Sequence, residues 1–225
     1  MSPRAIRYSR ARCQATRLPF PVLVGPPAAL AYPAPVAPAR SQPAGQISFR
    51  LRIELEEVEP AVWRRLLVPG SFGLEKLHDI FQVAMGWSNS HLHSFSIGGE
   101  SYGMLLEDDE DELYEDESNL TVLAALGGHD HFAYEYDFGD SWGHHVIVEE
   151  TTSSRLGLKH AVCLGGENAC PPEDCGGAGG YAELLAALAD PSHEEHEDLL
   201  EWIGGPFHPA TFDLVTVNAE LQRIR

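Results

Sequence analysis

The sequence contains no run of 18 or more apolar residues, so no segment of it predicts a membrane-spanning helix. Cysteine is scarce: four residues in 225 are too few for a disulfide scaffold, and we expect a reducing, cytoplasmic setting. The sequence also lacks a Gly-x-Ser-x-Gly elbow, a Walker loop, a dinucleotide-binding glycine fingerprint and a His-Glu-x-x-His motif. These absences exclude the commonest classes of enzyme.

Basic residues are few, with 15 Lys and Arg against 34 Asp and Glu and a formal net charge of −19. So acidic a surface repels phosphate backbones and anionic membranes. We therefore expect no membrane partner, and no direct nucleic-acid binding unless a cation offsets the repulsion. A protein partner or a small ligand remains as the expected partner.

The first 46 residues differ from the rest, with no Asp or Glu, six Arg and nine of the sixteen prolines. Such a segment, without hydrophobic periodicity, cannot bury enough surface to offset the entropy of ordering it. Residues 1–46 are therefore predicted to be a disordered tail, and residues 47–225 a single domain. Three interpretations of the tail stay open: an arm that binds acidic surfaces, a targeting presequence, or an extension from a misassigned start codon.

Hydrophobic periodicity predicts the elements of the domain. Residues 47–55 alternate apolar and polar side chains, as in a strand with one buried face, and residues 62–68 predict an antiparallel partner. Helical spacing over residues 74–85, followed by Gly86, predicts a helix with a glycine terminator. Alternating runs on both sides of a turn at 137–140 predict a hairpin.

The remaining segments follow by the same rules. A short strand is predicted over 93–97, and short helices over 120–126, 181–188, 194–202 and 212–224. The acidic run 107–117 predicts a solvated loop, and the Gly, Pro and Cys-rich residues 163–180 a long loop. Strands that come first, helices that come later and no repeated βαβ unit indicate an α+β fold, with a mostly antiparallel sheet and helices packed on one face.

Two histidines stand just after the predicted helix. His91 and His93 are two residues apart, so in a strand their side chains point the same way and can chelate one metal ion. The alternative is that both are surface residues that flank Leu92. The spacing alone leaves the two interpretations open.

The hairpin turn holds the second polar group. Asp137 and Asp140 can cap backbone N–H groups there, and Gly139 can take a positive φ. Two carboxylates close to His144 would also suit a metal ion or an acid–base pair. The Asp-Phe-Gly triplet is not that of a kinase, because no glycine-rich phosphate loop or His-Arg-Asp motif accompanies it.

Two further stretches are rich in candidate ligands. Between Cys163 and Cys175 the cysteine spacing is not the paired Cys-x2-Cys of zinc knuckles, which disfavours a zinc site made by this loop alone and leaves a buried or reactive thiol. Residues 193–196, His-Glu-Glu-His, match neither orientation of the metalloprotease motif. They are interpreted as the exposed acidic start of a helix.

Four blocks of sequence resemble the plasmid pRiA4b ORF-3-like family, in order over about 47–222. They are residues 58–65, 85–93, 136–144 and 169–177. The resemblance implies a small α+β domain with an antiparallel sheet and no generally assigned reaction. The residues that match the polar signature of the family are His91, His93, Asp137, Asp140, Trp142, His144, Cys170, Glu173 and Asp174. Gly143 departs from it, because relatives often carry an acid there.

Some members of this family are labelled as passengers of mobile elements, with a resolvase-like name. A serine resolvase needs a nucleophilic serine among arginines and a basic DNA-binding helix. Residues 47–225 instead carry nine basic and 34 acidic residues. The label therefore implies an association with mobile elements and does not indicate a mechanism.

Two functions remain. The one we favour is a binding or interaction module, with Trp87, Asp137, Trp142 and Cys170 as binding residues and Trp63 as a further contact aromatic. The alternative is a metal-dependent hydrolase or nuclease-like enzyme. Its candidate ligands are His91, His93, Asp140 and His144, and its candidate general bases are Glu173 and Asp174. Three motifs carry these residues: the histidine pair 91–93, the hairpin turn 137–144 and the Cys-Pro-Pro-Glu-Asp loop 170–174. If the three motifs meet at one edge of the sheet, they form one acidic, His-rich site that suits a divalent metal ion.

Overall fold

The computed structural model describes residues 46–105 and 114–224. These residues belong to one compact unit, Ser41–Arg225. The predicted tail lies outside the described residues except for Gln46, which already belongs to the first strand. This unit contains all the elements described below.

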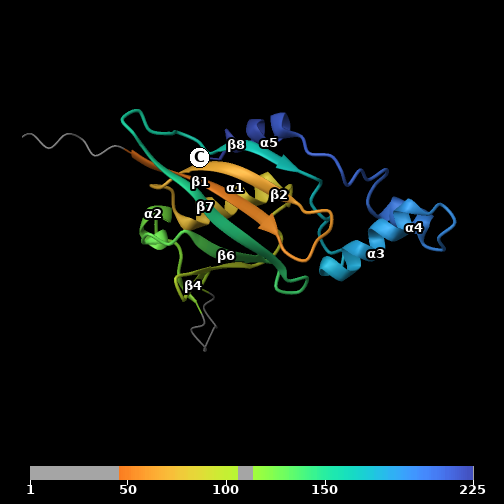
Figure 1. Ribbon diagram of the computed structural model, residues 1–225. Coiled ribbons are helices and arrows are strands. Elements are labelled where there is room, and N and C mark those ends of the chain that lie inside the picture. The colour runs from red at the N-terminus through yellow and green to blue at the C-terminus, as the bar shows by residue number, and fades with distance from the viewer. Residues whose placement is uncertain (1–45, 106–113, 225) are drawn as a thin grey trace, which may run out of the picture. The chain divides into compact units, whose positions relative to one another are not determined.

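Eight strands of the described chain form one mixed sheet in the order β5-β4-β3-β6-β7-β1-β2-β8 (Figure 1). Neighbouring strands are antiparallel except for the parallel pair β4 and β5, so the predicted mostly antiparallel α+β sheet is confirmed. The strands are β1 (Gln46–Leu55), β2 (Trp63–Pro69), β3 (His93–Ile97), β4 (Glu100–Gly103), β5 (Glu115–Asp116), β6 (His131–Tyr136), β7 (Trp142–Ser154) and β8 (Val162–Glu167).

The alternation that predicted β1 is confirmed by its burial. Leu51 and Ile53 are fully buried, whereas Arg50 and Arg52, which alternate with them along the strand, are partly exposed. β1 pairs with β2 on one side and with β7 on the other, so it is an interior strand of the sheet. Its inward side chains therefore lie at the centre of the hydrophobic core.

Five helices accompany the sheet in the described residues: α1 (Leu74–Met85), α2 (Val122–Leu126), α3 (Gly177–Ala189), α4 (His196–Trp202) and α5 (Leu214–Leu221). α1 has the predicted bounds, and Gly86 ends it in the left-handed conformation, with φ 99°. Its apolar side chains Leu77, Ile80 and Phe81 are fully buried in the core. No helix of the described residues is long and apolar enough to cross a membrane.

The helices of the described chain form two groups, and their packing on one face of the sheet stays a prediction. α1 contacts α2 and α5, while α3 and α4 pack on each other as a separate pair (Figure 1). α3 also starts earlier than predicted, because the glycines from Gly177 to Gly180, which indicated a loop, form its first turn. Composition alone does not show this, since glycine disfavours a helix wherever packing does not impose one.

The segment predicted as one long loop begins with strand β8, which pairs with β2. Its two glycines, Gly165 and Gly166, suggested loop. At Gly166 the missing side chain has a packing reason: a Cβ would lie 2.7 Å from Cδ of Arg64 and 3.0 Å from the ring of Phe212. The glycine therefore makes room for a buried arginine inside a strand.

Most of the predicted acidic loop, residues 107–113, lies outside the described residues. Its end differs from the prediction, because Glu115 and Asp116 form the short edge strand β5, which pairs with β4. Glu117 is 3% exposed and does not face solvent. Its carboxylate lies 3.1 Å from Nε2 of His93, which accounts for the burial of an acid at the end of an acidic run.

Candidate functional site

The three predicted motifs meet around the imidazole of His91. Its Nε2 lies 3.2 Å from Oδ1 of Asp174, 3.6 Å from Oδ2 of Asp137 and 3.9 Å from Oε2 of Glu173. His91 precedes β3, Asp137 follows β6, and the other two residues lie between β8 and α3. The antiparallel pairing of β3 with β6 brings the first two together, because the start of one strand adjoins the end of the other.

Left-handed backbone conformations aim two of these carboxylates. Asp137 has φ 57° and Asp174 has φ 58°, a conformation that Asp tolerates better than most residues. Asp137 uses Oδ1 to accept a hydrogen bond from the backbone N of Gly139 at 2.9 Å, so its other oxygen remains free to face His91. One carboxylate thus serves both the turn and the cluster.

Glu173 is fixed by hydrogen bonds to one of its oxygens. Oε1 accepts from the backbone N of Ser88 at 2.6 Å and from the hydroxyl of Tyr136 at 3.1 Å, while Oε2 faces His91. Burial raises the pKa of Glu173, but the hydrogen bonds from Ser88, Tyr136 and Ser90 outweigh burial and hold it below its ordinary value. The group is therefore a permanent anion near neutral pH.

A buried polar network of α1 holds the loop that carries His91. The backbone N of Asn89 donates to Oε1 of Gln82 at 3.0 Å, and Oδ1 of Asn89 lies 2.7 Å from Nε2 of His78. Ser90 donates its backbone N–H to the hydroxyl of Tyr136 at 3.0 Å. The position of His91 is thus set by residues one layer further inside the molecule.

The Cys-Pro-Pro-Glu-Asp loop is tied to the same edge by two contacts. Nε1 of Trp87 donates to the carbonyl oxygen of Pro171 at 3.0 Å, and the Trp87 ring stacks on Tyr136 with centroids 4.9 Å apart. Asp140 accepts a hydrogen bond from the backbone N of Gly176 at 3.1 Å. These contacts hold the two carboxylates of the loop next to His91.

Nε2 of His91 is buried yet makes no hydrogen bond of acceptable geometry, although three carboxylates surround it. Its ring packs edge-on against Tyr136, with centroids 5.8 Å apart. Ligand atoms of His91, Asp137 and Asp174 all lie within 4.8 Å of one another. Atoms that bind one metal ion at about 2.1 Å lie about 3–4 Å apart, so a small movement would allow these three to share an ion.

The structure does not bring the four sequence-predicted metal ligands together. His91 belongs to the cluster, but His93 is 7% exposed, stacks on His78 at 3.5 Å and contacts Glu117. Asp140 faces the backbone of Gly176 instead of the imidazole. The alternation rule assumed that both histidines belong to one strand, whereas β3 begins only at His93.

His144 is fully buried in the sheet. Its Nδ1 lies 3.2 Å from the carbonyl oxygen of Tyr134, and its Nε2 has no hydrogen-bond partner. Burial lowers the pKa of His144 to about 4, so the ring is neutral at physiological pH. It packs edge-on against Trp87 at 5.4 Å. His144 therefore contributes to the site by packing against Trp87, which holds the Cys-Pro-Pro-Glu-Asp loop.

Of the candidate binding residues, Trp87, Asp137 and Trp142 are buried, and Cys170 is partly buried. Trp87 is 8% exposed and Trp142 1%, so their rings pack in the core and do not present a contact surface. Burial raises the pKa of the Cys170 thiol far above its ordinary value, and that of Cys175 to about 12. Neutral thiols are weak nucleophiles, which disfavours a reactive cysteine.

Sequence reasoning missed the residues that position the cluster. Tyr136 belongs to the alternating run that predicted the hairpin, and its pattern gave no sign that its hydroxyl contacts Glu173 and the loop before His91. His78 and Gln82 are polar residues on the buried face of α1. Polar residues on the apolar face of a predicted helix could have indicated a buried polar network, because buried polar groups need hydrogen-bond partners.

Two hollows adjoin the cluster. His91 and Asp137 line an open groove of about 580 Å³, whose walls include the partly exposed apolar side chains of Leu92, Met104 and Phe138. Asp174 lines a second hollow of about 500 Å³ beside α3 and α4. A molecule can therefore approach the carboxylates and the imidazole from solvent.

The fold and the site together define an α+β protein with a histidine–carboxylate cluster at one edge of a mostly antiparallel sheet. The model of the plasmid pRiA4b ORF-3-like protein family matches residues 47–216, and the chain belongs to that family. This confirms the resemblance drawn from the four sequence blocks.

Two similar proteins come from Sinorhizobium fredii and Methanosarcina mazei. The chain is 42% identical over 157 residues to the uncharacterized protein y4hQ of Sinorhizobium fredii (strain NBRC 101917 / NGR234), a match that covers 69% of this chain and 80% of that protein. The crystal structure of the protein of unknown function MM3350 from Methanosarcina mazei Go1 is similar, with a TM-score of 0.68 and 30% identity. That match covers 76% of this chain and 97% of the other.

Proposed function

We propose that this protein is a small-ligand-binding module whose site is a divalent-cation centre made by His91, Asp137 and Asp174, with Glu173 beside it. One observation carries the proposal. A buried ring nitrogen that makes no hydrogen bond faces carboxylate oxygens from two other motifs at 3.2 to 3.9 Å. A buried polar atom without a partner is rare in native structures, and a missing ion is one of its recognised explanations.

The charges of the cluster support a cation. Three carboxylates share one small region, and like charges so close repel one another unless a positive group intervenes. In the described part of the chain, their ion pairs are all with His91, and no Lys or Arg pairs with them. A divalent ion would offset the repulsion that the imidazole alone cannot offset.

The donor atoms indicate the kind of ion. One imidazole nitrogen with two or three carboxylate oxygens suits zinc, manganese or ferrous iron better than calcium or magnesium, which prefer oxygen donors alone. The groove beside His91 and Asp137 leaves one side of the cluster open. An oxygen atom of a small ligand would complete the coordination there, while the ligand's apolar part contacts Leu92 or Phe138.

A metal-dependent hydrolase is the second candidate. It is favoured by Asp174, whose side chain is 71% exposed and adjoins solvent on one side and His91 on the other. Such a carboxylate could accept a proton from a metal-bound water. Glu173 suits that role poorly, because two donors already occupy Oε1 and keep its pKa low. Asp174 is therefore the better candidate for a general base, and the binding module remains the function that we favour.

The test is to titrate the untagged, metal-free protein with Zn²⁺ and with Mn²⁺ and to measure metal binding by calorimetry. We expect one equivalent bound, with the affinity at least about tenfold lower in His91→Ala and in Asp174→Asn. His131→Ala is the matched control, because His131 forms an exposed pair with Asp130 at 2.8 Å and lies outside the cluster. Absence of binding at millimolar metal, or equal losses in the cluster variants and the control, would refute the centre.

Catalysis is tested separately with the metal-loaded protein. Turnover of p-nitrophenyl esters or of bis-p-nitrophenyl phosphate that disappears in Asp174→Gln would favour the hydrolase. The same protein without turnover, but with one tightly bound ion, would favour the module. We further propose a cytoplasmic location, which the three free cysteines of the described chain support.

A further inference from the structure

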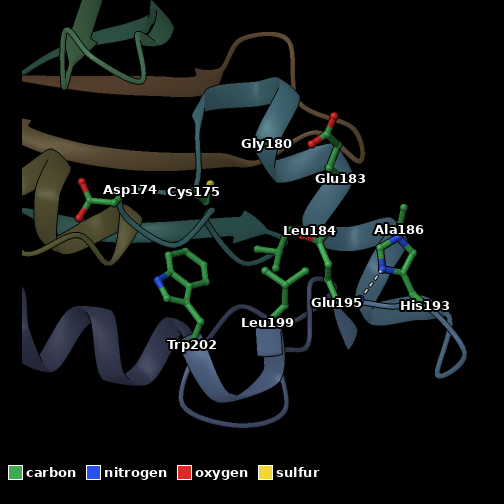
Figure 2. Close-up of a pocket in the computed structure, with 10 residues that line it drawn as sticks. All are labelled: Asp174, Cys175, Gly180, Glu183, Leu184, Ala186, His193, Glu195, Leu199 and Trp202. Carbon is green, nitrogen blue, oxygen red and sulfur yellow. Dashed lines mark hydrogen bonds between the residues drawn. The ribbon is translucent and has the colours of Figure 1, made fainter. Parts of the chain in front are cut away.

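A second hollow lies beside α3 and α4, and Asp174 of the His91 cluster is among the residues that line it. It has a volume of about 500 Å³, within the range of pockets that hold small organic molecules. Figure 2 shows Leu184, Leu199 and the indole of Trp202 close together along it, with Asp174 at one end and His193 at the other. The floor of the pocket is therefore apolar and its ends are polar.

Leu184 is buried at the base of this pocket, but the apolar side chains that α4 contributes are partly exposed. α4 has no buried residue at all, although Leu199 and Trp202 belong to it. Trp202 keeps 49% of its surface exposed, whereas Trp87 and Trp142 are almost fully buried. A bound molecule would cover the indole and stabilise a helix that the rest of the chain holds weakly.

The charged groups around the pocket are all acidic. Asp174, Glu183 and Glu195 line it, and no Lys or Arg is among the described residues that do. Glu195 precedes α4, but its side chain makes no capping hydrogen bond, so the carboxylate is available to a ligand. Burial raises the pKa of the neighbouring Cys175 thiol to about 12, so this thiol adds no charge.

We infer that this pocket binds a small organic cation, an amine or guanidinium carried on an apolar body. Its positive group would pair with Glu195 or Asp174, and its body would pack on Leu184, Leu199 and the face of Trp202. An indole face attracts cations more strongly than other aromatic rings do, which adds to the charge complementarity. The pocket goes beyond the proposed cation centre, and it shares only Asp174 with that centre.

The test compares three molecules of similar shape: phenethylamine as cation, 2-phenylethanol as neutral analogue and 3-phenylpropionate as anion. Binding to the full chain is followed by calorimetry and by tryptophan fluorescence in excess EDTA, so that the His91 centre plays no part. We expect the amine to bind about tenfold more tightly than the alcohol, and the acid not to bind. Equal affinity for amine and alcohol, or no binding of the amine at 10 mM, would overturn the inference.

Variants locate the site. Glu195→Gln and Trp202→Leu are expected to weaken amine binding about fivefold or more, and both change exposed side chains, so the fold should persist. Glu201→Gln is the matched control, because Glu201 is an exposed acid of α4 outside the pocket. Equal losses in Glu195→Gln and Glu201→Gln would show a general charge effect and refute the site. Binding of a Lys-rich peptide without binding of the amine would indicate a protein partner and also refute it.

Discussion

Nε2 of His91 lies 3.2 Å from Oδ1 of Asp174, although the two residues belong to motifs far apart in the sequence. The contact depends on two independent constraints. The loop before β3 is held by the polar side chains of α1, and the loop before α3 is held by Trp87 and Asp140.

Tyr136→Phe should weaken cation binding about tenfold or more and cost about 1–2 kcal/mol of stability. The change removes the hydroxyl that donates to Glu173 and accepts from Ser90, so two neighbours of the cluster lose their position. Calorimetry with Zn²⁺ and urea unfolding measure the two effects. Tyr102→Phe is the control, because Tyr102 is a partly buried tyrosine of β4 that lies outside the cluster. Equal loss of affinity in both variants would show that Tyr136 does not position the site.

Gly177→Ala should destabilise the protein by about 1–3 kcal/mol and weaken cation binding. Gly177 has φ 68°, and a Cβ there would lie 2.6 Å from the carbonyl oxygen of Asp140, so the loop that carries Asp174 must move. Gly179→Ala, in the same helix, meets no atom within 4 Å and should be neutral or stabilising by up to about 1 kcal/mol. Thermal unfolding and metal titration of both variants provide the check. A Gly177→Ala protein that unfolds and binds metal like the wild type would contradict this account.

Stability should fall as the pH is lowered from about 6.5 to about 4. Burial lowers the pKa of His144 to about 4, and burial together with the nearby His93 lowers that of His78 to about 4. The unfolded chain, with ordinary histidine pKa values near 6.5, therefore binds more protons in this range. Each histidine contributes about 3 kcal/mol that is present above pH 6.5 and lost as the pH falls through 4.

Urea unfolding between pH 4 and pH 7 measures this slope in the wild type and in His144→Phe. In His144→Phe the free energy of unfolding should change with pH about half as steeply as in the wild type, since only His78 of the two histidines remains. His131→Phe changes an exposed histidine and should leave the slope unchanged. If His144→Phe unfolds with the pH dependence of the wild type, His144 is not neutral in the folded protein.

Arg64→Met should destabilise the protein by about 3 kcal/mol or more. Arg64 is 2% exposed and donates to the carbonyl oxygens of Ala84, Trp63, Glu167 and Asn168, which would all lose a partner. Arg65→Met, in the next position of β2, breaks an exposed pair with Glu149 and should cost about 1 kcal/mol or less. Chemical unfolding of the two variants tests the contrast. A cost for Arg64→Met no larger than for Arg65→Met would refute the role of the buried guanidinium.

Local rules recovered the elements whose sequences carry a regular period. The alternation over 47–55 and the helical spacing over 74–85 gave β1 and α1 nearly to the residue, because both bury one regular face. The same rules failed at β8 and at the start of α3, where glycine indicated loop. There glycine is required by a close approach of other chain segments, and no local pattern reveals such an approach.

The sequence by itself determined the acidic charge, the mostly antiparallel α+β sheet, and the motifs from which the cluster is drawn. Only the tertiary structure decided which of their residues meet: His91 with Asp137, Glu173 and Asp174, and not with His93 or His144. The reason is physical. Spacing along a strand fixes the direction of a side chain only while the strand continues, whereas strand pairing and left-handed turns bring together atoms from distant segments.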